Sequence, residues 1–266
     1  MTNLLDQKLK QLQPRKALIP FITAGYPNPD LTVDIMHCLV ENGADVIELG
    51  MPFSDPMADG PVIQKASEQA IQQGTNLKQT LSMVAEFRQS NQTTPIVLMG
   101  YLNPVESMGY AAFVEQAAQS GVNGVLLVDS PPEESAELQK QLNAHQLRQI
   151  FLVAPTTSER RKKLICEMAQ GFIYYVALKG VTGAADLDAE TVNLAVKALK
   201  NDTSLPVAVG FGVKDAQSAV AVATQADAVV IGSALIKSLA ACQSIEQTQH
   251  EIAQFLQPIR SALDSL

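Results

Sequence analysis

The stretch that decides the fold lies near the end of the chain, where residues 206–234 read PVAVGFGVKDAQSAVAVATQADAVVIGSA. Two short apolar runs, Pro206–Val209 and Ala228–Ile231, enclose an amphipathic segment, Asp215–Thr224. Continuous apolar character is typical of a parallel strand that is covered on both faces. This stretch therefore predicts a strand, a helix and a second parallel strand, with a glycine-containing turn after each strand.

The same alternation extends over the rest of the 266 residues. Six further strand candidates come before this unit: Ala17–Thr23, Val46–Gly50, Ile96–Tyr101, Gly124–Val128, Gln149–Val153 and Phe172–Ala177. The other predicted helices include Leu31–Glu41, Leu77–Gln89, Ala111–Gln119, Ser135–Ala144, Glu159–Met168, Ala189–Lys200 and Ile245–Ala262. Eight strands that alternate with helices predict an α/β fold, a (β/α)8 TIM barrel with residues 1–266 as one domain. An open doubly wound sheet is the main alternative, but no G-x-G-x-x-G motif follows the first strand.

Signals at helix ends support the barrel. Asp30, Ser158 and Asp188 are each predicted to cap the first turn of the helix that follows. The first residues of the chain predict an extra N-terminal amphipathic helix rather than a signal peptide, because leucines recur at helical spacing: Leu4, Leu5, Leu9 and Leu12.

Composition limits the class of protein. The formal net charge is −8, and no basic stripe is present that would favour nucleic acid. No apolar run approaches the roughly 20 residues of a membrane span, so we expect a cytoplasmic protein without membrane contact. The three cysteines, Cys38, Cys166 and Cys242, are each expected in a helix and lack zinc-ligand spacing. They predict reduced thiols and no metal site.

The chemistry is concentrated in residues 48–61, which read ELGMPFSDPMADGP. Glu48 falls near the carboxyl end of an apolar strand, with its side chain either in the barrel mouth or outward against the helices. A buried carboxylate needs a cationic partner, and otherwise its pKa rises. Glu48 is thus either a salt-bridged structural residue or a general acid and base. Asp59 follows in a proline-rich loop, where it either begins a helix or supplies a second acid to the same site.

Three glycine-rich turns follow the last three strand candidates, at residues 180–184, 210–213 and 232–234. Barrels commonly bind phosphate with such loops, because backbone N–H groups at glycines can approach an anion. Lys179 has two interpretations, a Schiff-base lysine or a solvated lysine at a loop entrance. The candidate phosphate-binding residues are Gly183, Gly212, Gly232 and Ser233.

At these motifs the sequence resembles the α chain of tryptophan synthase. The resemblance rests on FITAGYP at residues 21–27, on the run 48–61, on YLNP at residues 101–104 and on the three glycine turns. It implies a lyase of tryptophan biosynthesis that cleaves indole-3-glycerol phosphate to indole and glyceraldehyde 3-phosphate by a retro-aldol reaction.

The resemblance also implies roles for individual residues. Glu48 would carry the protons, Asp59 would accept a hydrogen bond from the indole N–H, and Tyr174 would orient Glu48. A lid is expected around Thr182 and Gly183. The implied substrate contacts are Phe21, Met99, Tyr101 and Thr182.

The implied partner is the pyridoxal-phosphate-dependent β subunit, which receives the indole in an allosteric α2β2 heterotetramer. This chain itself is expected to carry no cofactor.

The chain departs from the family at Ala177-Leu178-Lys179 and at Met51 and Met57. Three rival functions are a barrel acting on a phosphoribosyl intermediate, a lyase without a β partner, and a non-catalytic subunit that activates a partner. The residues expected to face the β subunit are Pro52, Asp55, Pro56, Met57, Asn103 and Pro104.

Overall fold

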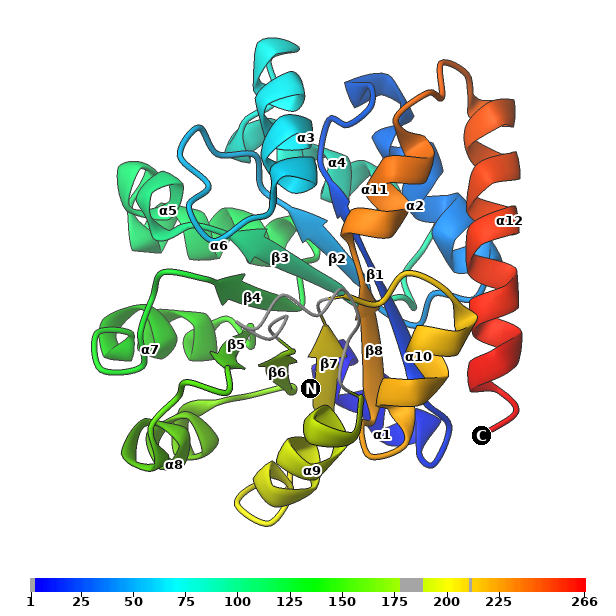
Figure 1. Cartoon of the computed structure of the whole chain (residues 1–266). Coiled ribbons are helices and arrows are strands. Elements are labelled where there is room, and N and C mark those ends of the chain that lie inside the picture. The colour runs from blue at the N-terminus through cyan, green and yellow to red at the C-terminus, as the bar shows by residue number, and fades with distance from the viewer. Residues whose placement is uncertain (1–2, 178–188, 211) are drawn as a thin grey trace.

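Eight parallel strands form a closed barrel in a computed structural model that describes residues 3–177, 189–210 and 212–266 (Figure 1). Each strand pairs with its neighbours in sequence, and β8 returns to pair with β1. The strands are β1 (Ala17–Thr23), β2 (Ile47–Gly50), β3 (Ile96–Gly100), β4 (Gly124–Leu127), β5 (Arg148–Val153), β6 (Ile173–Val176), β7 (Val207–Gly210) and β8 (Ala228–Ile231). This confirms the predicted (β/α)8 barrel.

Helices surround the barrel, and an additional helix precedes the first strand, as predicted (Figure 1). The helices before β5 are α1 (Leu4–Leu12), the short 3-10 helix η1 (Pro29–Leu31), α2 (Thr32–Glu41), α3 (Pro61–Gln72), α4 (Leu77–Phe87), α5 (Leu102–Met108), α6 (Tyr110–Ser120) and α7 (Ala136–Ala144). Those after β5 are α8 (Glu159–Met168), α9 (Ala189–Leu199), α10 (Ala216–Ala223), α11 (Ser233–Leu239) and α12 (Ile245–Leu263). The predicted bounds differ from these by two residues at most, which is ordinary for helix and strand ends.

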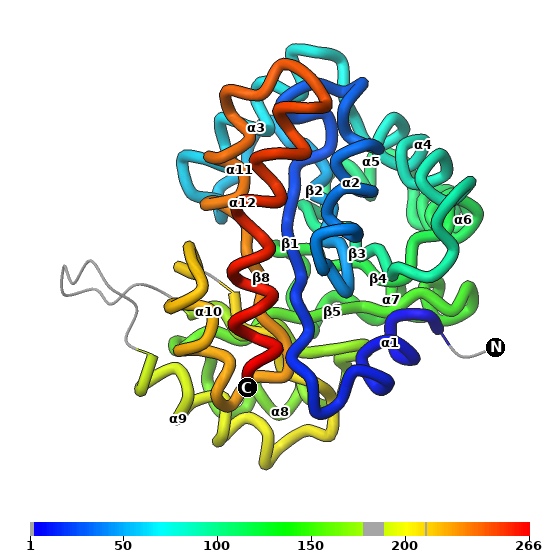
Figure 2. Tube along the Cα trace, turned by 90° about the vertical axis from the view of Figure 1, so that its right-hand side faces the viewer, coloured from blue at the N-terminus to red at the C-terminus, as the bar shows by residue number. Residues whose placement is uncertain are grey.

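Two hydrophobic cores hold the barrel together. One lies between the strands and the surrounding helices, and the other fills the interior of the barrel. Leu5 and Leu9 of α1 belong to the interior core and are buried, so α1 closes the end of the barrel at which the strands begin. Figure 2 shows α1 and the last turn of α12 near the start of β1. Loops that follow the strands form the opposite end of the barrel.

Helix caps agree with the sequence at one predicted position and differ at another. Ser158 accepts a hydrogen bond from the backbone of Arg161 and caps α8, as predicted. The prediction for Asp30 is wrong, because Asp30 lies inside η1 and its own backbone N–H is capped by the side chain of Asn28. An extra 3-10 turn before α2 moves the capping position two residues upstream. Asp188 lies outside the described residues.

The cysteines are free, and Cys38 and Cys166 lie in helices as predicted. The prediction for Cys242 is wrong, since α11 ends at Leu239 and the backbone of Cys242 closes a turn onto that residue.

Among the described helices, none is long and apolar enough to cross a membrane. Within the same residues, no group of three or more acidic, histidine or cysteine side chains is placed to hold a metal ion.

A buried ion pair ties the end of the chain to the start of the barrel. Asp45, just before β2, accepts hydrogen bonds from Arg15 at 2.8 Å and from Arg260 of α12 at 3.0 Å. It also accepts the backbone N–H of Leu18 in β1 at 2.9 Å. These three partners satisfy a carboxylate that would otherwise be costly to bury.

Candidate active site

Glu48 lies near the carboxyl end of β2 and points into the barrel. Val46 packs in the interior core, and residues two apart on a strand share a face, so Glu48 has the same direction. Its register partners are Phe21 on β1 and Val97 on β3. The side chain is only 1% exposed. Of the two directions open to Glu48 from the sequence, the interior one is therefore correct.

The Glu48 carboxyl has no partner that would stabilise its charge. Neither oxygen has a hydrogen-bond partner among the described residues, and no ion pair to it occurs there. Burial, together with the nearby charge of Asp59, raises the pKa of Glu48 to about 8. The salt-bridged structural alternative is thus not found in the described part of the chain, and Glu48 holds a proton near neutral pH.

Asp59 lies at the end of the loop between β2 and α3, beside Tyr101. The Tyr101 hydroxyl donates a hydrogen bond to Asp59 Oδ2 at 3.1 Å and accepts one from the backbone of Ala58 at 3.0 Å. Burial raises the pKa of Asp59, and the hydrogen bond from Tyr101 opposes that rise. α3 begins at Pro61 and its N-terminus has no side-chain cap, so Asp59 is not used to start that helix.

Tyr174 on β6 lies inside the barrel, in the interior core. Burial raises the pKa of Tyr174 well above its usual value, with smaller contributions from the charges of Glu48 and Asp59. The phenol therefore stays neutral, and the charges of both acids act on it. A Cβ added to Gly210 at the end of β7 would collide with the Tyr174 hydroxyl, which explains the absence of a side chain at residue 210.

A pocket brings together four of the residues that the sequence singled out, although Glu48 and Tyr174 are not among its lining residues. Phe21, Met99, Tyr101 and Asp59 line it together, at the ends of β1 and β3 and in the loop before α3. The further lining residues that sequence reasoning did not propose for the site include two apolar side chains and two with hydroxyl groups: Ile63, Val128, Thr23 and Ser67. The sequence could have indicated Thr23, because it is the last residue of a predicted strand and barrel active sites lie at the carboxyl ends of the strands.

Two of the predicted phosphate-binding turns lie side by side. β7 and β8 are paired, β7 ends at Gly210 and β8 at Ile231, so the turns that follow are neighbours. Gly212 has a φ of 83°, a conformation that favours glycine. Gly232 precedes α11, and Ser233 is its exposed first residue. Thr182, Gly183 and Lys179 lie outside the described residues.

The residues predicted to face a partner lie in two segments, the loop before α3 and the start of α5. The loop before α3 contacts the start of α5, where the rings of Phe53 and Tyr101 lie 5.1 Å apart. Met57 in this loop is 79% exposed. Pro52 is buried, so it supports the loop from inside. Pro56 and Pro104 are half-buried, and the exposed members are Asp55, Met57 and Asn103.

Comparison with known proteins shows the family of the chain. Residues 7–264 match the family model described as tryptophan synthase alpha chain. The tryptophan synthase alpha chain of Laribacter hongkongensis is 56% identical over 99% of this chain and 100% of its own.

Solved structures give the same result. The tryptophan synthase subunit alpha of Legionella pneumophila superimposes with a TM-score of 0.92 at 41% identity, over 100% of both chains. A chain of the tryptophan synthase complex from Pyrococcus furiosus superimposes with a TM-score of 0.82 at 34% identity, over 93% of this chain and 98% of that one. The chain therefore belongs to the tryptophan synthase alpha chain family and is an indole-3-glycerol-phosphate lyase of tryptophan biosynthesis.

Proposed function

We propose that Glu48 carries the protons in the retro-aldol cleavage of indole-3-glycerol phosphate, with Asp59 as the second acid, and that residues 1–266 act as one catalytic domain. The observation that carries this proposal is the buried Glu48 carboxyl, which has no hydrogen-bond partner among the described residues and a pKa raised to about 8. An acid that is neutral at rest can give a proton, and its conjugate base can take one back.

Glu48 takes part in two proton transfers, giving one proton and taking up another. Glu48 protonates C3 of the indole ring, which places positive charge on the ring nitrogen. The resulting Glu48 carboxylate then accepts the proton of the side-chain hydroxyl. The bond between C3 and the side chain breaks, its electrons return to the ring, and indole and the aldehyde of glyceraldehyde 3-phosphate form. Glu48 ends in its initial protonated state, so one residue completes the cycle.

Asp59 stabilises the charge that develops on the ring. One of its oxygens already accepts the Tyr101 hydroxyl, which fixes the direction of the carboxylate. The other oxygen has no hydrogen bond within the described part of the chain, and it would accept the indole N–H. Phe21 and Met99 would form the walls beside the ring. Tyr174 would orient Glu48 without exchanging a proton.

The phosphate would be held where β7 and β8 end. The backbone N–H groups of Gly212 and Gly232 and the Ser233 hydroxyl are the donors in this proposal, together with Thr182 and Gly183 outside the described residues. The start of α11 would add partial positive charge. Local donors are required because the whole chain carries a net charge of −8.

The product indole would pass to a partner. In tryptophan synthase the pyridoxal phosphate resides in the β subunit, not in the α chain. We propose that this chain docks on such a subunit in an α2β2 assembly, through the exposed Met57, Asp55 and Asn103 with Pro56 and Pro104, over Pro52. Substrate-dependent allosteric coupling would accompany docking. We also propose a cytoplasmic location, which the three free cysteines support.

Indole release tests the residue assignments. Wild type is compared with Glu48→Gln and Asp59→Asn, with and without a β subunit, and substrate affinity is measured separately. We expect both variants to lose at least about a hundredfold in rate while they still bind substrate. Unchanged release by Glu48→Gln would contradict the proton-transfer role, and activation of β by that variant without lyase activity would reveal a separate regulatory role.

A further inference from the structure

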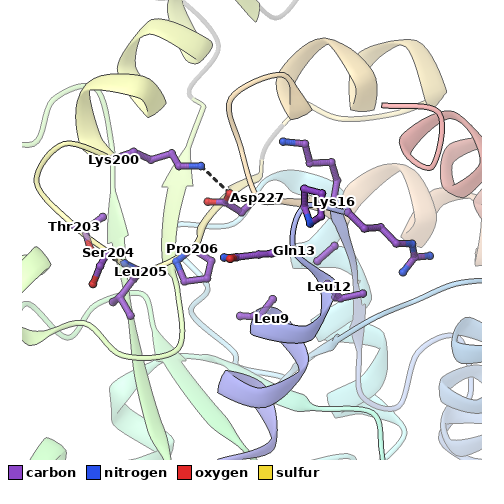
Figure 3. Close-up of a pocket in the computed structure, with 13 residues that line it drawn as sticks. Leu9, Leu12, Gln13, Lys16, Lys200, Thr203, Ser204, Leu205, Pro206 and Asp227 are labelled. Atoms are coloured by element: carbon purple, nitrogen blue, oxygen red, sulfur yellow. Dashed lines mark hydrogen bonds and ion pairs between the residues drawn. The ribbon is translucent and has the colours of Figure 1, made fainter.

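A second pocket lies at the end of the barrel opposite the candidate active site (Figure 3). It is an open cavity of about 350 Å³, which is within the size range of small-ligand sites. Three separate segments form it: the end of α1 with the turn into β1, the turn from α9 into β7, and Asp227 just before β8. The catalytic proposal uses none of these residues.

One end of this base pocket carries a surplus positive charge. Lys200 and Asp227 form an ion pair at 2.7 Å, and the other Asp227 oxygen accepts the backbone N–H of Val207 at 2.9 Å. Lys16 is half-buried and donates to the carbonyl oxygen of Ala226 at 2.8 Å. Among the described residues, no carboxylate lies within ion-pair distance of Lys16. Burial lowers the pKa of Lys16, the charge of Asp227 opposes that change, and the charge of Lys200 adds to it.

The other end of the pocket has apolar side chains on two sides, with polar Gln13, Thr203 and Ser204 also in its lining. Leu9 and Leu12 of α1 lie on one side, and Leu205 and Pro206 lie on the opposite side (Figure 3). The Gln13 side chain extends between them towards Pro206 (Figure 3). The pocket thus combines apolar side chains with two lysines that share one carboxylate, Asp227, which leaves one positive charge in surplus in a chain whose net charge is −8.

From this combination we infer that the base pocket binds a small organic carboxylate, with its single negative charge at Lys16 and its apolar body against the leucines and Pro206, beside the Gln13 side chain. A singly charged head matches the one surplus positive charge, whereas a doubly charged phosphate would leave one negative charge unmatched beside Asp227. Charge-assisted hydrogen bonds between ammonium and carboxylate are stronger than neutral ones, so the charge decides the ligand class.

Three matched probes test this inference by nuclear magnetic resonance on the full isotopically labelled chain. Phenylacetate offers both the charge and the apolar body, phenylacetamide the body alone, and acetate the charge alone. We expect phenylacetate to bind about tenfold more tightly than either of the others. The amide signals that move are expected to be those of Leu12, Lys16 and Ser204. Equal affinity for phenylacetamide, or shifts confined to other parts of the barrel, would overturn the inference.

Two variants separate binding from folding. Lys16→Met removes the charge and is expected to weaken phenylacetate about tenfold, while Lys10→Met, at an exposed α1 position outside the pocket, is expected to leave the affinity unchanged. If Lys16→Met unfolds, Ser204→Asp replaces it, because exposed Ser204 lines the pocket and tolerates a charge. The added carboxylate is expected to repel phenylacetate. Unchanged affinity in a folded Lys16→Met or Ser204→Asp variant would contradict the inference.

Discussion

Replacement of Glu48 by Gln is expected to stabilise the protein, and to do so more at high pH. An unfolded chain ionises this carboxyl near pH 4.5, whereas the folded chain holds it neutral up to a pKa of about 8. The neutral carboxyl therefore costs no stability below pH 4.5, and its cost grows as the pH rises from 4.5 to 8. At 1.4 kcal/mol per pH unit, the cost is at most about 2 kcal/mol at pH 6 and about 5 kcal/mol at pH 8.5.

Glutamine has nearly the same shape and cannot ionise, so it removes the part of the cost that depends on pH. Urea unfolding of wild type and Glu48→Gln is measured from pH 6, above the isoelectric point of about 4.9. We expect the difference in free energy of unfolding to grow by about 2–3 kcal/mol between pH 6 and pH 8.5. Glu190→Gln is the control, because it makes the same chemical change at an exposed site of α9. A pH-independent difference for Glu48→Gln would refute the reasoning.

Three further changes test other parts of the structure. Tyr101→Phe removes the hydrogen bond that directs Asp59, so we expect indole release to fall about tenfold with little change in substrate affinity, measured by steady-state kinetics and direct binding. Gly210→Ala places a methyl group against the Tyr174 hydroxyl and is expected to cost about 1–3 kcal/mol in urea unfolding. Combination with Tyr174→Phe should recover part of that loss, and no recovery would locate the strain elsewhere. Asp45→Ala removes one carboxylate from a cluster in which Arg15 and Arg260 also pair with Asp264, and it leaves the buried backbone N–H of Leu18 without its acceptor. We expect a cost of about 1–3 kcal/mol in urea unfolding, and no measurable loss would contradict the buried network.

Much of the fold was predictable because the strands are short, apolar and regularly spaced. The bounds of β1, β8 and α8 coincide with their predictions, and α1 was predicted from its leucine spacing. Capping was less predictable. Asp30 and Asn28 are both good capping residues, and only the extra 3-10 turn selects Asn28.

The candidate site was predictable in its residues but not in its geometry. A strand buried on both faces has no alternation of polar and apolar residues, so the sequence could not give the direction of Glu48. The contact between Asp59 and Tyr101 joins residues 42 positions apart, and it exists only because the loop folds over β3. Met57 was expected to be exposed and is, whereas Pro52 in the same loop is buried. The base pocket had no sequence signal, since three distant segments form it.

The protonation of Glu48 is the central claim, and carbon-13 NMR of the labelled glutamate carboxyl carbons tests it most directly. The Glu48 signal is identified by its absence from Glu48→Gln. The structure predicts a titration midpoint of about 8, so most of the carboxyl is still protonated at pH 7. A midpoint near the ordinary glutamate value of 4.5 would contradict the account, because an ionised Glu48 has no proton to give to the indole ring.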